Sequence, residues 1–174
     1  MSKAFTREDD ADDAPVLPRP VPLLPPGARN YLTAAGARRL REELQRLAEV
    51  ERPKWLAQAG ETGARGAEAK EELQRVEQRM AHLGQCLQSA EIVAPPLPPH
   101  DTVRFGATVT VRDARGQEMV YRIVGADEAD FARDEVSWLS PIAKALLNAR
   151  LGQKVACKLP AGTTTLEVVR IAYG

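Results

Sequence analysis

The sequence predicts an α+β protein in which a helical hairpin precedes a small mixed domain. Three observations carry this prediction. Apolar residues in the first half recur at coiled-coil spacing, a proline-rich stretch interrupts the chain at residues 94–99, and apolar residues after it alternate with a period of two. A helical period that changes once to a strand period is typical of chains whose helices and strands are segregated.

Composition limits the classes of function. The 174 residues suffice for one domain or two small ones, and their formal net charge is zero. A free-standing DNA-binding domain usually has a basic excess, so we expect no sequence-specific DNA binding. Cys86 and Cys157 lack CxxC spacing, which predicts a reducing compartment and no metal site. No apolar run is long enough for a membrane span or a signal-peptide core, so we expect a cytoplasmic protein.

Residues 1–29 have the composition of a disordered arm. An acidic cluster at residues 8–13 is followed by six prolines, Pro15, Pro18, Pro20, Pro22, Pro25 and Pro26. Such a segment buries too little apolar surface to offset its loss of conformational entropy.

A first helix is predicted from Thr33, its N-cap, to roughly Gln58. The spacings 3, 4 and 3 of a coiled-coil seam separate its apolar residues Ala37, Leu40, Leu44 and Leu47. Pro53 interrupts the seam and predicts a kink, because proline removes a helical hydrogen bond. Trp55 and Leu56 are expected to restore the apolar stripe in a new register.

The second helix is the clearest periodic signal. Spacings of 4 and 3 alternate through Ala69, Leu73, Val76, Met80, Leu83, Leu87 and Ala90. A turn containing Gly60, Gly63 and Gly66 would join the two helices into an antiparallel hairpin over residues 30–93.

Beyond a stiff linker at residues 94–100, the pattern predicts strands and one short helix in a domain of residues 101–174. The predicted strands are residues 108–111, 120–124, 136–139, 154–159 and 165–172; the first two form one hairpin and the last two another, around residues 160–162. Ser140 as N-cap and Pro141 at the first helical position start the helix, and Gly152 is expected to end it.

The segment Ser140-Pro141-Ile142-Ala143-Lys144-Ala145-Leu146-Leu147 is followed by Gly152. This pattern resembles the C-terminal signature of the Gre transcript-cleavage factors (GreA/GreB), and the chain as a whole resembles the GreB branch most. Further matches, in order, are residues 1–8, 31–36, 51–53, 103–111, 121–125 and 159–162. The resemblance covers roughly residues 30–173 and implies a coiled-coil hairpin followed by an FKBP-like α+β domain.

The resemblance also implies a partner and a role. Such factors bind bacterial RNA polymerase at the rim of its secondary channel, with the loop at Ser140, Pro141, Ile142 and Ala143 as the contact. The hairpin enters the channel and can touch the 3′ end of the nascent RNA. Acidic tip residues there help the polymerase to hold a second Mg²⁺ for RNA cleavage. The factor would therefore be no enzyme by itself and have no cofactor of its own.

The tip departs from the family pattern, which is Gly-Asp-x-x-Glu-Asn. Here Gly60-Glu61-Thr62-Gly63-Ala64-Arg65 stands in its place, and Arg65 would repel a divalent cation. The hairpin is also about eight residues short, which retracts the tip by about 6 Å. We therefore expect weak or no stimulation of cleavage. The alternatives are that Glu61 and Glu68 still supply metal ligands, or that they belong to a solvated turn.

Other charged residues allow two interpretations each. Arg65, Arg75 and Arg79 are possible RNA or polymerase contacts, with His82 extending a basic stripe. Equally, Arg65 is a plain surface residue, and Glu71 pairs with Arg75 one helical turn away. An acidic loop, Asp127, Glu128 and Asp130, either contacts the polymerase or is solvated. Neither His82 nor His100 has partners at metal-ligand spacing.

A third hypothesis comes from a different class, a prolyl isomerase or chaperone. It requires an apolar pocket lined by aromatic side chains. The domain offers Phe105, Tyr121, Phe131, Trp138 and Tyr173, which we consider too few, and we expect Trp138 in the core.

Overall fold

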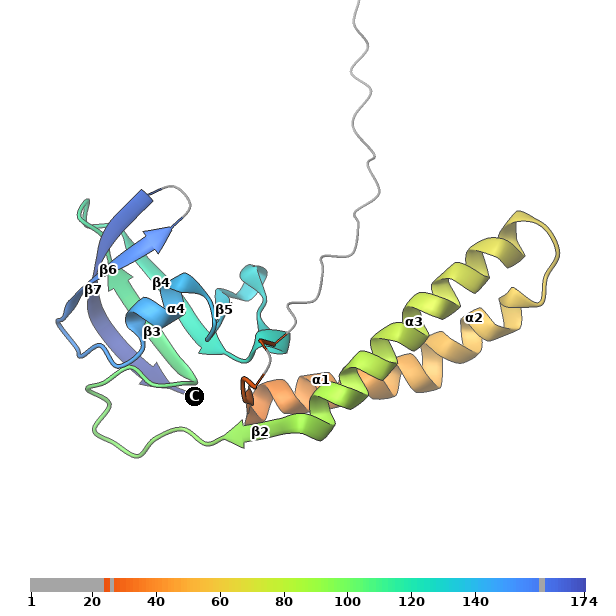
Figure 1. The fold of residues 1–174 in the computed structure, drawn as a ribbon, viewed down its shortest axis with the longest axis horizontal. Helices are drawn as coiled ribbons and strands as arrows, with labels where there is room; N and C mark the ends of the chain where they lie inside the picture. The colour runs from red at the N-terminus through yellow and green to blue at the C-terminus, as the bar shows by residue number, and fades with distance from the viewer. Residues whose placement is uncertain (1–23, 26, 160–161) are drawn as a thin grey trace, which may run out of the picture.

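The computed structural model of the chain describes residues 24–25, 27–159 and 162–174. A helical hairpin extends from one side of a small domain built around a curled sheet (Figure 1). Most of the predicted N-terminal arm, and Pro160 and Ala161 of the last predicted turn, lie outside the described residues. None of the described helices is both long enough and apolar enough to cross a membrane.

The first arm of the hairpin is a continuous helix that changes its winding halfway. It consists of α1 (Ala34–Arg46), a π-helical segment η1 (Leu47–Glu51) and α2 (Arg52–Ala59). The Thr33 hydroxyl accepts a hydrogen bond from the Gly36 N–H, which confirms the predicted N-cap. A π-helical segment ends at Glu51, two residues before Pro53, where the sequence predicts a kink. A wider turn accommodates a proline whose ring would otherwise collide with the preceding turn.

The second arm, α3 (Ala64–Ser89), runs back along the first. Leu32, Leu40, Leu47, Val76 and Leu83 are among the buried residues of the hairpin core. Fully burying one such side chain stabilises the fold by roughly 1.5–3 kcal/mol. Trp55 packs against this core as expected, but Leu56 is 52% exposed, so its predicted place in the stripe was wrong.

The turn at the tip is shorter than the three glycines suggested. Gly60 and Gly63 flank it, whereas Gly66 lies inside α3 and is buried. A Cβ at Gly66 would overlap the backbone carbonyl of Glu61. The turn therefore packs tightly onto the first turn of α3.

Two short strands that no local sequence pattern predicts close the base of the hairpin. In a parallel pair, β1 (Asn30–Thr33) lies beside β2 (Ala90–Val93). The Asn30 amide donates a hydrogen bond to the Cys86 carbonyl at 3.0 Å. The helices are thus anchored at the end that meets the second domain.

The second domain contains a five-stranded sheet in the order β5-β4-β3-β7-β6. Its elements are β3 (Ala107–Arg112), β4 (Glu118–Val124), β5 (Glu135–Ser137), α4 (Pro141–Leu146), β6 (Lys154–Leu159) and β7 (Gly162–Tyr173). Both predicted antiparallel pairings are present, β3 with β4 and β6 with β7. Strand β5 pairs with β4 in parallel. The core includes Val109, Ile123, Leu146 and Val168.

Two predicted boundaries in this domain were wrong. The strand predicted at 136–139 is Glu135–Ser137, because Trp138 and Leu139 turn towards α4. Helix α4 ends at Leu146, well before Gly152. Asn148 takes the left-handed conformation after the helix (φ 67°), a position that asparagine tolerates. Gly152 belongs to a later turn.

Candidate functional site

The hairpin tip contains a hollow of about 440 Å³. Its lining residues come from both arms and the turn: Trp55, Gln58, Glu61, Arg65, Glu68 and Ala69. The three tip residues singled out in the sequence, Glu61, Arg65 and Glu68, thus lie around one cavity. Trp55 and Gln58 were not predicted as part of it, since the periodic pattern assigned Trp55 only to the helix core.

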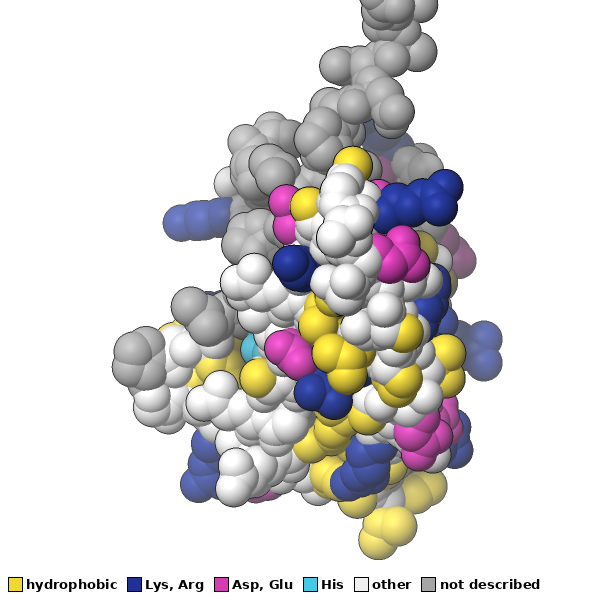
Figure 2. All heavy atoms as spheres, turned by 90° about the vertical axis from the view of Figure 1, so that its right-hand side faces the viewer, with side chains coloured by type: hydrophobic (Ala, Val, Ile, Leu, Met, Phe, Trp, Pro, Cys, Tyr) yellow, Lys and Arg dark blue, Asp and Glu magenta, His cyan; other side chains and the backbone are white. Residues whose placement is uncertain are grey.

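The charged groups of this hollow have no partners within the described residues. Glu61, Arg65 and Glu68 make no ion pair or side-chain hydrogen bond there, and all three are exposed. Lys54 Nζ lies 4.3 Å from the ring centroid of Trp55, within cation–π range. Viewed from the tip end of the molecule, apolar, acidic and basic side chains are interspersed (Figure 2). The tip therefore has mixed charge.

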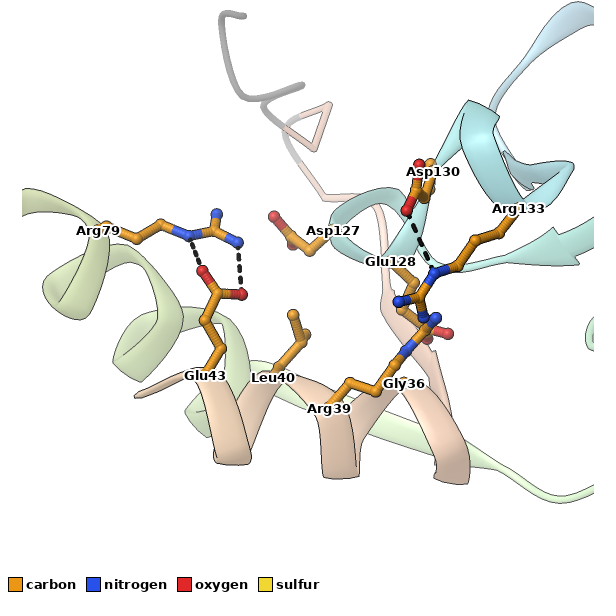
Figure 3. Close-up of a pocket in the computed structure, with 10 residues that line it drawn as sticks. Gly36, Arg39, Leu40, Glu43, Arg79, Asp127, Glu128, Asp130 and Arg133 are labelled. Carbon is orange, nitrogen blue, oxygen red and sulfur yellow. Dashed lines mark hydrogen bonds and ion pairs between the residues drawn. The ribbon is translucent and has the colours of Figure 1, made fainter. Parts of the chain in front are cut away.

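The basic stripe along α3 is paired with carboxylates. Arg79 donates two hydrogen bonds to Glu43, at 2.8 and 3.0 Å (Figure 3). The hydrogen bonding of Arg79 to the Glu43 carboxylate is the main cause that raises the pKa of Arg79. Arg75 pairs with Glu72, so the predicted partner Glu71 was wrong. Carboxylates of the same chain therefore neutralise most of the positive charge of this stripe.

The side chains of Asp127 and Glu128 in the acidic loop are buried rather than solvated, whereas the Asp130 side chain is 47% exposed. Glu128 is 5% exposed, and its carboxylate accepts hydrogen bonds from the Thr33 N–H at 2.6 Å and the Thr33 hydroxyl at 2.7 Å. Burial raises the pKa of Glu128 above its ordinary value. Glu135, also buried, accepts a hydrogen bond from Arg39 at 2.9 Å. These contacts fix the base of α1 to the second domain.

Asp127 makes the matching contact to α3. One carboxylate oxygen lies 2.6 Å from His82 Nε2, and the other accepts a hydrogen bond from the Cys86 thiol at 3.1 Å. Burial, with the neighbouring carboxylate, raises the pKa of Cys86 to about 11. A cavity of about 300 Å³ lies at this junction, between α1, Arg79 of α3 and residues 127–133 (Figure 3).

The Ser-Pro segment presents only part of its motif to solvent. The Ser140 hydroxyl accepts a hydrogen bond from the Ala143 N–H at 3.2 Å, as predicted for the cap of α4. Pro141 is exposed and Ser140 is half-buried, whereas Ile142 and Ala143 are buried in the domain core. Any contact made by this loop therefore depends on Ser140 and Pro141.

The aromatic residues form no single cluster. Phe105 and Trp138 line a groove of about 590 Å³, together with Tyr31 from the base of the hairpin. The Tyr31 ring centroid lies 5.7 Å from that of Phe105 and 5.3 Å from that of Trp138. Trp138 also packs against the core, as predicted. Tyr121, Phe131 and Tyr173 do not line this groove, and Phe131 is 76% exposed.

In the part of the chain that the structure describes, no group of three or more His, Cys, Asp or Glu residues is placed to hold a metal ion.

A long helical hairpin fixed to a small α+β domain defines an elongated protein with an exposed tip. Comparison of the sequence with known protein families shows which family has this architecture. Residues 30–92 match the family of N-terminal domains of transcription elongation factors, and residues 98–173 match the family of GreA/GreB C-terminal domains. The chain belongs to the GreA/GreB family of transcription elongation factors.

Two relatives, a GreB and a GreA, agree with this assignment. The chain is 35% identical over 154 residues to transcription elongation factor GreB of Neisseria meningitidis serogroup A, covering 83% of this chain and 94% of the relative. It is 38% identical over 151 residues to GreA of Anaeromyxobacter sp., covering 82% and 91%. Among solved structures, GreA factor homolog 1 (Gfh1) of Thermus thermophilus is 28% identical with a TM-score of 0.38, covering 83% and 99%.

Proposed function

We propose that this factor binds RNA polymerase at its secondary channel and regulates transcription with weak or no stimulation of transcript cleavage. The hairpin would enter the channel, and the second domain would dock at the rim through Ser140 and Pro141. Membership of the GreA/GreB family supports the choice of partner.

The composition of the tip hollow carries the proposal. Mg²⁺ is bound through carboxylate and water oxygens with near-ideal octahedral geometry. Around this hollow Arg65 accompanies Glu61 and Glu68, so a fixed positive charge shares the cavity with the two carboxylates. Its repulsion opposes a divalent cation at the same place. The donor set thus fits a shared Mg²⁺ poorly, and we assign no cleavage step to it.

The α3 pairings also argue for a limited role of the hairpin in holding RNA. Arg79 has its hydrogen bonds satisfied by Glu43, and Arg75 is paired with Glu72. A guanidinium that already holds a carboxylate must lose that contact before it binds a phosphate. Among the three candidates, Arg65 is the one whose guanidinium has no partner within the described residues.

The test is RNA cleavage in stalled, backtracked polymerase complexes. We expect the protein alone to give little cleavage, and to suppress cleavage by an active Gre factor as its concentration rises. Pro141→Ala should weaken this suppression, whereas Glu118→Ala, at an exposed site on β4, should not.

Two results would overturn the proposal in different ways. Strong cleavage that is lost in Glu61→Ala or Glu68→Ala would establish the alternative, a factor that rescues backtracked polymerase through these carboxylates. Absence of both cleavage and competition would mean that the protein does not occupy the channel.

A further inference from the structure

The lining of the tip hollow is divided chemically. Trp55 and Ala69 supply an apolar wall, Gln58 a neutral amide, Glu61 and Glu68 hydrogen-bond acceptors, and Arg65 a cation. The three charged side chains do not pair with one another or with any other described residue. Most arginines along the hairpin, by contrast, are engaged by carboxylates, as Arg52 is by Glu77. Unused polar groups of both signs therefore surround an apolar surface.

The backbone around this hollow is held in place. The Glu61 N–H donates to the Gln58 carbonyl at 3.0 Å, and the Ala67 N–H donates to the Gly63 carbonyl at 3.2 Å. The absence of a side chain at Gly66 lets the Glu61 carbonyl approach the start of α3 closely. A site whose walls are already ordered loses less entropy on binding.

This combination matches the parts of a nucleotide. A base packs favourably against an aromatic side chain, base N–H groups donate to carboxylates, and a guanidinium binds phosphate. The volume, about 440 Å³, lies within the range of small-molecule sites. We propose that the hairpin tip binds one nucleotide unit, with its base against the Trp55 ring in place of the Lys54 ammonium, its N–H edge towards Glu61 or Glu68, and its phosphate at Arg65.

The acceptors also predict which base is preferred. Guanine carries two adjacent donors, N1–H and the 2-amino group, which match the two oxygens of one carboxylate. Uracil presents a single donor between two carbonyl oxygens. These oxygens repel a carboxylate. Guanine nucleotides should therefore bind better than uridine nucleotides. That the nucleotide comes from the 3′ end of RNA rests on the proposed function, whereas binding itself does not.

The binding experiment uses the full chain without polymerase. The protein has two tryptophans, so Trp138→Phe leaves Trp55 with the only indole N–H signal in a ¹H–¹⁵N spectrum. This protein is titrated with GMP, UMP and ribose 5-phosphate, with circular dichroism to verify that it stays folded. We expect a saturable shift of the Trp55 signal with GMP, a several-fold weaker effect with UMP, and little with ribose 5-phosphate.

Two further substitutions separate the site from general charge effects. Arg65→Gln should weaken GMP binding roughly tenfold, the loss expected for one charge-assisted hydrogen bond. Arg41→Gln removes the same charge from an exposed position on α1 and should leave binding unchanged. No saturable shift with GMP, or equal effects of the two substitutions, would overturn the proposal.

A short RNA ending in guanosine distinguishes the sources of the nucleotide. Binding of this RNA that is tighter than that of GMP supports the RNA 3′ end, and equal binding supports a free nucleotide. Because these measurements contain no polymerase, failure to bind GMP leaves the competition result intact. Failure to compete in the backtracked complex likewise leaves GMP binding intact.

Discussion

Replacing Gly36 by Ala should destabilise the protein, although Ala is the better helix former. Gly36 lies in the first turn of α1, and a Cβ there would overlap the buried carboxyl group of Glu128. Moving that group breaks its two hydrogen bonds to Thr33, of 2.6 and 2.7 Å. Hydrogen bonds to charged groups contribute about 1.5–3 kcal/mol each, and the helix regains about 1 kcal/mol from Ala. The expected net loss is about 2–5 kcal/mol.

Gly84→Ala is the matched control. Gly84 lies inside α3, five residues before its last residue, Ser89, and a Cβ there meets no atom of the described residues within 4 Å. This substitution should stabilise the protein by about 1 kcal/mol, because it adds only helix propensity. Urea unfolding followed by circular dichroism at 222 nm gives both free energies of unfolding. A Gly36→Ala protein as stable as the wild type would refute the contact of Glu128 with Thr33 at the start of α1.

Three further predictions concern buried or paired groups. Because burial raises the pKa of Glu128, its contribution to stability is present below the ordinary glutamate pKa and is lost as pH rises through the raised value. The wild type should therefore lose stability relative to Glu128→Gln as pH rises above the ordinary glutamate pKa, and a constant difference between their urea midpoints would contradict this. With a pKa of about 11, Cys86 should react slowly with iodoacetamide at neutral pH in the native protein and quickly in urea, as peptide mass spectrometry would show. A double-mutant cycle between Arg79 and Glu43, whose side chains are 34% and 31% exposed, should give a coupling of about 0.5–1 kcal/mol; zero coupling would mean that the pair does not form in solution.

The predictable parts of this fold are those with local signals. Thr33 and Ser140 cap helices at their predicted positions, and the alternation of apolar residues identified both antiparallel hairpins of the sheet. Strands β1 and β2 were missed because each has four residues and pairs with a segment sixty positions away. Such a short run carries no period of its own.

The candidate site also contains residues that the sequence could predict and residues that it could not. The sequence placed Glu61 and Arg65 at the tip because the two helical periods define where the turn must be. It could not show that Glu128 is buried, since the groups that receive its carboxylate belong to Thr33, 95 positions earlier. Isolated from that partner, an acidic loop is indistinguishable from a solvated one.

The burial of this loop bears directly on the proposed function. Asp127 holds α3, Glu128 holds Thr33, and Glu135 holds Arg39, so one short segment of the second domain determines the direction of the hairpin. Helix α3 has 26 residues and is about 39 Å long at 1.5 Å per residue. A rotation of about 10° at its base would thus move the tip by about 7 Å, several times a metal–ligand distance of about 2 Å. In a channel, the position of the tip hollow therefore depends as much on these three carboxylates as on the tip sequence itself.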